Sequence, residues 1–303
     1  MLSESSTPSR AFRMARYKRA WFLVPLAVYL LVMFGYPLYY SIVISFQHLN
    51  QITVIRGHAP FNGVVNYIAA WSGSGIWHIV ANTIEFTVLS IIFQFVIGLL
   101  LALLFNRKFP ANGFLRALIL VPWLIPQLVS GTIFKWMFDS TDGIINEALL
   151  GLHIIHHPIS WLLHPQSALI VIIITNIWIG IPFNMVLIYS GLKDVPQELY
   201  EAAQIDGAGK WKSFLHITVP SVRTVFAIVL MLGLIYTLKV FDIVMTLTGG
   251  GPENATQLLS TWSYTLSFTN FDFGQGAAIA NGLIVIALCF TAVYLWFNKR
   301  ALD

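Results

Sequence analysis

Two groups of residues have side chains that could do chemistry, and neither has the spacing that its chemistry requires. The first is Gly209-Lys210. A phosphate-binding loop needs another glycine five positions before its Gly-Lys pair and a Ser or Thr directly after the lysine to bind Mg²⁺. These two positions are Gln204 and Trp211. We therefore predict that this chain does not hydrolyse ATP and carries no cofactor of its own.

The second group is a set of histidines in one predicted loop, His153, His156, His157 and His164. A metal could be captured there, but no acidic or Cys residue stands at ligand spacing from them, so we predict solvated histidines and no metal site. The chain also lacks an HExxH motif, a nucleophile elbow and a convincing Ser/His pair. We predict that it is not an enzyme.

The composition is that of a membrane protein. Of 303 residues, 57% are hydrophobic and 10% are charged, whereas a soluble domain carries about a quarter charged residues. The ten Trp, eleven Tyr and 22 Phe fit aromatic belts at the two membrane interfaces. The net charge of +4 is explained by topology, so we expect membrane lipid around the chain and no nucleic-acid partner.

Six apolar runs are long enough to span a bilayer, for which about 20 residues suffice. The predicted spans are 21–46, 79–105, 114–138, 167–191, 221–248 and 277–297. They form a single transmembrane domain, 21–300, after a basic tail, 1–20. Lys and Arg occur in the tail, around the second and fourth connections and after the last span, whereas the opposite connections hold only Arg56. The positive-inside rule therefore puts both termini in the cytoplasm.

The connection 194–220 is patterned as a helical hairpin. Asp194 and Gln197 have the spacing of a capping box. One face of a first helix would carry Leu199, Ala202, Ala203 and Asp206. Gly207 and Gly209 would break it, and a second helix would end at Pro220. We predict a helix–Gly–helix hairpin that lies on the membrane surface and presents Glu201 to a partner.

This hairpin resembles the EAA loop of ABC-importer permeases, at Glu201-Ala202-Ala203, Asp206-Gly207-Ala208, Phe214, Ile217 and Val219-Pro220. In that family the loop is the coupling helix that docks into a groove of the cytoplasmic ATPase. The resemblance implies that ATPase coupling rests on Glu201, Ala202, Ala203, Asp206 and Gly207. The alternative is an ordinary amphipathic hairpin at the interface.

Ionisable residues at bilayer depth are candidates for function. In the predicted fifth span, one face would carry Tyr236, Lys239, Asp242 and Thr246. Lys239 and Asp242 could neutralise each other at i, i+3. We interpret this stripe either as a wall of a translocation path or as a structural pair that faces a partner subunit.

Neutral polar groups also lie at depth. Asn176, Gly180 and Asn184 share one face of the fourth span, and Trp178, Gln127, Gln94 and Asn281 add further groups. Such a lining suits an uncharged, hydroxyl-rich solute better than an ion, although the same residues can simply hold helices together. The candidate translocation-path residues are Tyr236, Lys239, Asp242, Asn184, Trp178 and Asn281.

A second resemblance lies in the external connections. Phe241-Asp242, Leu247–Pro252 and Thr256 resemble the end of the fifth span in carbohydrate-type permeases, and Phe61-Asn62-Gly63 and Phe271–Gly274 resemble segments of the maltose and glycerol-phosphate permeases. The resemblance implies an all-α membrane protein with the type I ABC importer permease fold in the bacterial cytoplasmic membrane. It also implies three kinds of partner: a second permease subunit, two ATPase subunits that bind Mg-ATP, and an extracytoplasmic solute-binding protein. For the pair of permease subunits, the resemblance favours a heterodimer.

We therefore expect a permease subunit of an ATP-driven importer for a sugar or related polyol. The same architecture could import glycerol phosphate, but an anionic solute would need buried basic groups, and Lys239 is the only deep candidate. A secondary transporter would need a coupling-ion site or inverted repeats, and the sequence shows neither.

Overall fold

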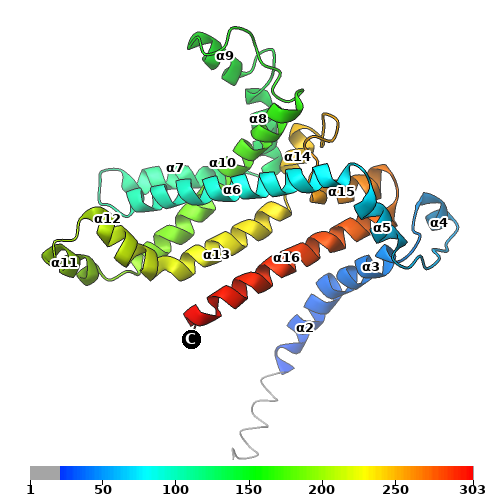
Figure 1. The fold of residues 1–303 in the computed structure, drawn as a ribbon, viewed down its shortest axis with the longest axis horizontal. Helices are drawn as coiled ribbons and strands as arrows, with labels where there is room; N and C mark the ends of the chain where they lie inside the picture. The colour runs from blue at the N-terminus through cyan, green and yellow to red at the C-terminus, as the bar shows by residue number, and fades with distance from the viewer. Residues whose placement is uncertain (1–20, 303) are drawn as a thin grey trace, which may run out of the picture.

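The computed structural model describes residues 21–302, with side chains described except at position 295 and from 297 onward. The predicted basic tail, 1–20, lies outside the described residues. Within this range the chain is built from helices (Figure 1), and its only strand-like pairings are two isolated bridges, Gln47 with Phe61 and Asn50 with Asp272. The predicted all-α fold is confirmed.

Five helical segments of the described chain are long and apolar enough to cross a membrane, and the number is six if one bent pair of helices is counted as a single span. The five are 24–45, made of α2 (Val24–Leu30), η1 (Leu31–Gly35) and α3 (Tyr36–Ser45); α6 (Ile76–Phe105); α10 (Pro165–Lys193); 210–238, made of α12 (Lys210–Ser213), η2 (Phe214–Thr218) and α13 (Val219–Leu238); and α16 (Phe273–Leu302). The shorter helices between them are α4 (Gln51–Ile55), α5 (Val65–Ser72), α9 (Ile144–Gly151), α11 (Gln197–Ile205), α14 (Asp242–Leu247), α15 (Leu259–Tyr264) and η3 (Thr265–Thr269).

The bent pair consists of α7 (Asn112–Leu124) and α8 (Gln127–Met137), which meet at an angle of 98°. Between them Ile125 is extended, with φ −80° and ψ 132°, because the ring of Pro126 disfavours a helical conformation in the residue before it. Pro122, in contrast, stays inside α7. The sequence predicted one span over 114–138, and the structure shows that a helix ends within it, directly before Pro126.

The centre of the bundle is the pair α6 and α10, which lie side by side along much of their length (Figure 1). Hydrophobic side chains of these two helices pack with those of α8 and α14 in one cluster, which includes Phe86, Phe134, Ile172 and Ile243. A second cluster joins α6 to α5, α15 and α16 at the end of the bundle near α4. A third joins α6, α10 and α13 toward the hairpin end. The first and third clusters both include side chains of α10, and all three include side chains of α6.

Close approach of α6 and α10 depends on Gly98. A Cβ atom at this position would lie 2.6 Å from Cβ of Asn184 and 3.1 Å from the backbone nitrogen of Met185. We expect Gly98→Ala to destabilise the chain by about 1–3 kcal/mol through overpacking, measured as a lower Tm of the detergent-solubilised protein. Gly113→Ala is the matched control because a Cβ there meets nothing within 4 Å. Equal Tm values for the two variants would contradict the expectation.

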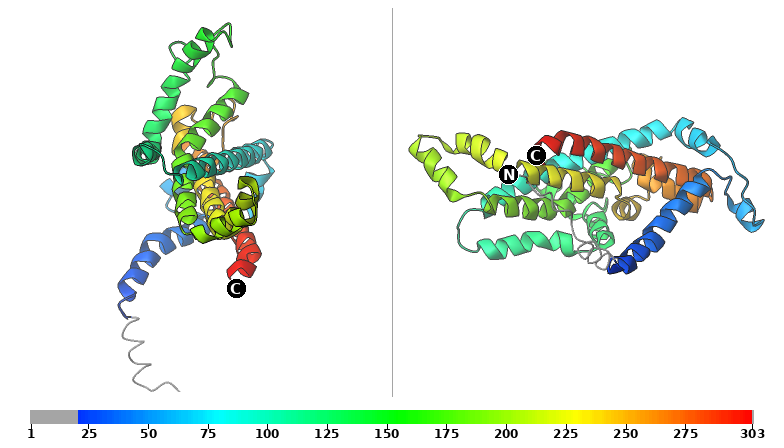
Figure 2. Two further views of the ribbon diagram at one scale, coloured as in Figure 1. Left: turned by 90° about the vertical axis from the view of Figure 1, so that its left-hand side faces the viewer. Right: turned by 90° about the horizontal axis from the view of Figure 1, so that it is seen from below.

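The first span stands apart from the rest. None of the residues of α2 is buried, and Figure 2 shows α2 pointing away from the other helices. At its far end α3 returns to the bundle, where the Ser41 hydroxyl donates to Oδ1 of Asn281 at 3.1 Å. Because α2 is apolar and has no buried residue in the described part of the chain, it leaves a large surface for lipid or a second subunit.

The connection that contains α9 is ordered by polar contacts. Asp139 follows α8, and its carboxylate accepts backbone N–H groups of Thr141 at 2.8 Å and Asp142 at 3.2 Å. These two hydrogen bonds lower the pKa of the Asp139 carboxyl below its ordinary value. Farther along, the buried amide of Asn146 donates to the carbonyl of Ile159 and accepts the N–H of the same residue.

Candidate functional site

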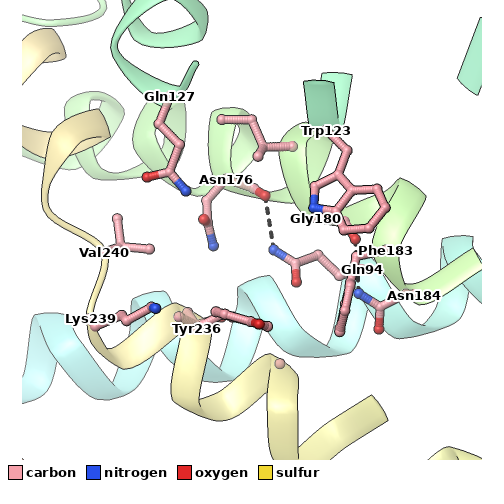
Figure 3. Close-up of a pocket in the computed structure, with 13 residues that line it drawn as sticks. Gln94, Trp123, Gln127, Asn176, Gly180, Phe183, Asn184, Tyr236, Lys239 and Val240 are labelled. Carbon is pink, nitrogen blue, oxygen red and sulfur yellow. Dashed lines mark hydrogen bonds between the residues drawn. The ribbon is translucent and has the colours of Figure 1, made fainter. Parts of the chain in front are cut away.

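A cavity of about 290 Å³ lies between α6, α10, α13 and the junction of α7 with α8 (Figure 3). Its volume is near the lower end of the range for small-molecule sites. It is lined by Gln94, Trp123, Gln127, Asn176, Ile179, Gly180, Phe183, Asn184, Gly233, Tyr236, Thr237, Lys239 and Val240. Amides, aromatic rings and one cation therefore face the same space.

Breaks in two helices bring side chains to this cavity. Trp123 is near the end of α7, and Gln127 begins α8 directly after Pro126. On the opposite wall α13 ends at Leu238, so that Lys239 follows it in a non-helical segment. Irregular backbone at membrane depth is tolerated where it is buried in protein or faces a water-filled cavity, and both breaks lie at such a place.

The amide groups of the cavity are only partly satisfied. Gln94 donates from Nε2 to the backbone carbonyl of Asn176 at 2.9 Å, and Asn184 donates to the carbonyl of Gly180 at 2.9 Å. Gly180 makes room for Gln94, because a Cβ at position 180 would lie 2.3 Å from the Gln94 amide carbon. Nδ2 of Asn176, in contrast, has no partner in the part of the chain that the structure describes, although this residue is only 6% exposed. Figure 3 shows its amide directed into the cavity.

Aromatic rings form a continuous wall. Trp123 and Phe183 have ring centroids 6.0 Å apart, and Phe183 meets Tyr236 edge to face at 5.5 Å. Nζ of Lys239 lies 4.7 Å from the centroid of the Tyr236 ring, a cation–π geometry. The wall thus offers flat apolar surfaces beside hydrogen-bond donors and a positive charge.

The predicted stripe on the fifth span is wrong in its geometry. The helix is interrupted after Leu238, and Asp242 begins a separate helix, α14. Because the chain turns between them, Lys239 contacts the ring of Tyr236 and forms no ion pair with Asp242. Farther along, Thr246 faces α8, where Gly131 leaves space for it.

Of the six candidate path residues, the structure brings three together in the cavity: Asn184, Tyr236 and Lys239. Trp178 packs against Phe134 and lines a different, apolar groove. Asn281 joins α16 to α3 through hydrogen bonds with Ser41.

Other lining residues were not among the candidates. Trp123 and Phe183 carry no polar signal in the sequence, and Gln127 and Asn176 were noted there only as neutral polar groups at depth. A break at Pro126 is the signal that could have directed attention to Trp123 and Gln127, because it exposes the residues on either side of the bend.

The hairpin 194–220 is a second unusual region, at the end of the molecule opposite α4 and α5 (Figure 1). As predicted, α11 is followed by a glycine turn and a second helical arm, α12 with η2. Gly207 has φ +75°, a conformation that side chains disfavour. The two arms are joined by the hydroxyls of Tyr200 and Thr218, which are 2.9 Å apart.

The predicted capping box at the start of the hairpin does not form. Asp194 is the C-cap of α10, and Pro196 is the residue that precedes α11, without a side-chain capping bond. Pro196 explains why the capping box is absent. The fixed φ of this proline is already suitable for entry into a helix, and α11 therefore starts two residues later than a capping box at Asp194 would require. The carboxylate of Asp194 therefore plays no part in starting α11.

The hairpin exposes apolar and acidic side chains together. Ile205 is 87% and Trp211 is 70% exposed, and Glu201, Ala202, Asp206 and Gly207 are exposed as well, whereas Ala203 is half-buried. Large apolar side chains that stand clear of the bundle beside charges are typical of a binding surface.

In the described part of the chain, no three His, Cys, Asp or Glu side chains gather closely enough to hold a metal ion.

Comparisons with known proteins identify the family. The model of the family described as "Binding-protein-dependent transport system inner membrane component" matches residues 94–303. The chain is 36% identical to the trehalose/maltose transport system permease protein MalF of Thermococcus litoralis, over 93% of each chain. It is 33% identical to the diacetylchitobiose uptake system permease protein DasB of Streptomyces coelicolor, over 95% of this chain and 87% of the relative. Its fold matches a chain of a bacterial ABC transporter for import of the acidic polysaccharide alginate, with a TM-score of 0.82, 21% identity and coverage of 96% and 99%. The protein therefore belongs to the family of binding-protein-dependent transport system inner membrane components, and it has the type I ABC importer permease fold that the sequence predicted.

Proposed function

We infer that this chain is one of two permease subunits of an ATP-driven importer for a sugar or related polyol. The observation that carries the proposal is the cavity in which the unpaired amide of Asn176 meets the aromatic wall. A sugar has C–H groups on its faces and hydroxyls around its edge. Aromatic rings pack against such faces, and amides both donate to and accept from hydroxyls. The names of the relatives, which include trehalose/maltose, diacetylchitobiose and sulfoquinovosyl glycerol transport, support the same class of solute.

The hairpin would couple this cavity to an ATPase subunit. Its exposed Ile205 and Trp211 offer apolar contact area, and Glu201, Ala202, Ala203, Asp206 and Gly207 form the turn and face that would enter a groove on the partner. Mg-ATP would bind on that partner, where hydrolysis would move the hairpin. Because η2 continues directly into α13, a displacement of the hairpin reaches Tyr236 and Lys239 through one helix.

The remaining partners follow from the same arrangement. A second permease subunit, expected to be a different chain, would cover the unpacked α2. A solute-binding protein would deliver the solute at the end near α4 and α5. The distribution of Lys and Arg supports a cytoplasmic hairpin, cytoplasmic termini and a place in the cytoplasmic membrane.

A second solute class is favoured by one observation. Lys239 faces the cavity and has no acidic partner within the described residues, so an anionic solute such as glycerol phosphate or an acidic sugar would gain a charge-assisted hydrogen bond there.

The experiment is uptake by the full assembly, purified through a tag on this chain and reconstituted in liposomes. We expect uptake of a neutral oligosaccharide that requires ATP inside and the binding protein outside. A solute panel that includes glycerol phosphate and an acidic sugar separates the two solute classes. Uptake by this chain alone under an ion gradient, without ATP, would contradict the importer and support a secondary transporter.

A further inference from the structure

An apolar groove of about 440 Å³ lies between α7 and α10 and shares no lining residue with the solute cavity. Leu118 and Pro122 of α7 form one wall, and Trp178 and Pro182 of α10 form the other. A proline inside a helix clashes with the carbonyl four residues earlier and bends the helix, which gives a physical reason for an opening between these two. Leu118 is about half exposed, so the groove is open at its side.

Two cations share one ring at one end of this groove. The guanidinium carbon of Arg116 lies 4.8 Å from the centroid of the Tyr189 ring, and Nζ of Lys193 lies 5.4 Å from the same centroid. The two cations can therefore be no more than about 10 Å apart, and an anion close to both would reduce the repulsion between them. Within residues 21–302 neither cation forms an ion pair, although Asp194 is next in the chain.

The cations lie beyond one end of the groove, measured along the two helices that form its walls. Arg116 precedes Pro122 by six residues in α7, and Tyr189 follows Pro182 by seven in α10. At a rise of 1.5 Å per residue, both separations are about 10 Å along the helices. Trp123 meets Phe183 and Arg116 meets Tyr189, so the two helices run antiparallel and the cations lie toward the end of α10, where the hairpin begins.

We propose that this surface binds one anionic phospholipid of the cytoplasmic leaflet. Its phosphate is held by Arg116 and Lys193, and an acyl chain fills the groove beside Leu118 and Pro182. Arg presents a planar fork of donors that matches phosphate oxygens, and Lys adds a point charge. A phosphate close to both cations reduces their repulsion. An apolar helix of a partner protein would cover the groove but would leave both charges unpaired, so a lipid with an anionic headgroup fits the surface better.

The test is native mass spectrometry of the full assembly, equilibrated with equal amounts of phosphatidylglycerol and phosphatidylcholine. We expect the wild type to retain phosphatidylglycerol preferentially, and the preference to fall about fivefold for each of Arg116→Gln and Lys193→Gln. Lys210→Gln is the matched control, because it removes one positive charge from the same end of the molecule but away from the groove. Equal retention of the two lipids by the wild type, or an equal loss in Lys210→Gln, would overturn the proposal in favour of diffuse surface charge.

A second variant tests the apolar half without a change of charge. Leu118→Trp fills the groove, and we expect it to lower the number of retained lipids while ATP-driven uptake shows that the assembly is intact. For the alternative occupant, Leu118→Cys in a Cys289→Ser background provides a single reactive thiol. Cross-linking of this thiol to another polypeptide, with no labelling by a photoreactive phosphatidylglycerol, would show that a protein helix occupies the groove and would refute the lipid site.

Discussion

Replacement of Asn176 by leucine is expected to lower solute uptake by about 10- to 100-fold, the loss that corresponds to one buried hydrogen bond. The side-chain nitrogen of Asn176 is buried and has no partner among the described residues, so a bound solute is the group that would satisfy it. Leucine has a similar volume and keeps the contacts of α10. The hydrogen bond from Gln94 goes to the backbone carbonyl of residue 176 and survives the substitution.

The same substitution should leave the stability of the free protein unchanged or slightly raised, because it removes a buried donor that is unsatisfied. The substitution is thus expected to lower uptake without lowering Tm. Thr87→Val is the matched control: the hydroxyl of Thr87 is also buried and unpaired, but Thr87 does not line the cavity. Normal uptake by Asn176→Leu, or an equal loss in Thr87→Val, would show that the Asn176 amide does not contact the solute.

The membrane-spanning helices could be predicted from the sequence because the signal for a span is the mean hydropathy of a long run of residues. A run of about 20 apolar residues has few alternatives to a span. The glycine turn could also be predicted from the sequence, since Gly207 adopts a positive φ that few other residues tolerate. The breaks were harder to predict. Pro122 and Pro126 look alike in the sequence, yet only Pro126 ends a helix, because the packing around each proline decides which bend is stable.

The interruption after Leu238 has no sequence signal at all. No proline or glycine lies between Leu238 and Asp242, so the spacing of Lys239 and Asp242 suggested a helical pair. In the structure Phe241 has φ −136° and ψ −56°, which removes the pair from a common face. Packing of α14 against α8 and α10 provides the contacts that replace a continuous helix.

Some errors could have been avoided with helical geometry alone. Asn176, Gly180 and Asn184 were correctly grouped on one face, and all three line the cavity. Trp178 is two residues from Asn176, which is about 200° around a helix of 3.6 residues per turn. It therefore had to point away from that face, as the structure shows. Close contacts such as Gly98 with Asn184 join helices far apart in sequence, and no local pattern predicts them.

Reversal of the charge at Glu201, in Glu201→Lys, is expected to lower ATP-driven uptake by more than about 100-fold, because a charge reversed inside a complementary interface costs several kcal/mol. The side chain of Glu201 is exposed and has no ion-pair partner in the described chain. Its reversal should therefore leave the fold and membrane insertion intact. The measurement is uptake together with ATP hydrolysis stimulated by the loaded binding protein, both in liposomes.

The turn of the hairpin provides an independent test of the same coupling, with a control two residues away. Gly207 has φ +75°, whereas Gly209 has φ −72° and ψ 166°, and a Cβ at either position meets nothing within 4 Å. Gly207→Val must therefore change the backbone of the turn, because a β-branched residue resists a positive φ, while Gly209→Val need not. We expect the first to lose stimulated ATP hydrolysis and uptake together and the second to retain both. Because the two variants add the same side chain in open space, a difference between them reports the angle of the hairpin and not its bulk. If both variants and Glu201→Lys transport normally, the hairpin is an interfacial structure without a coupling role.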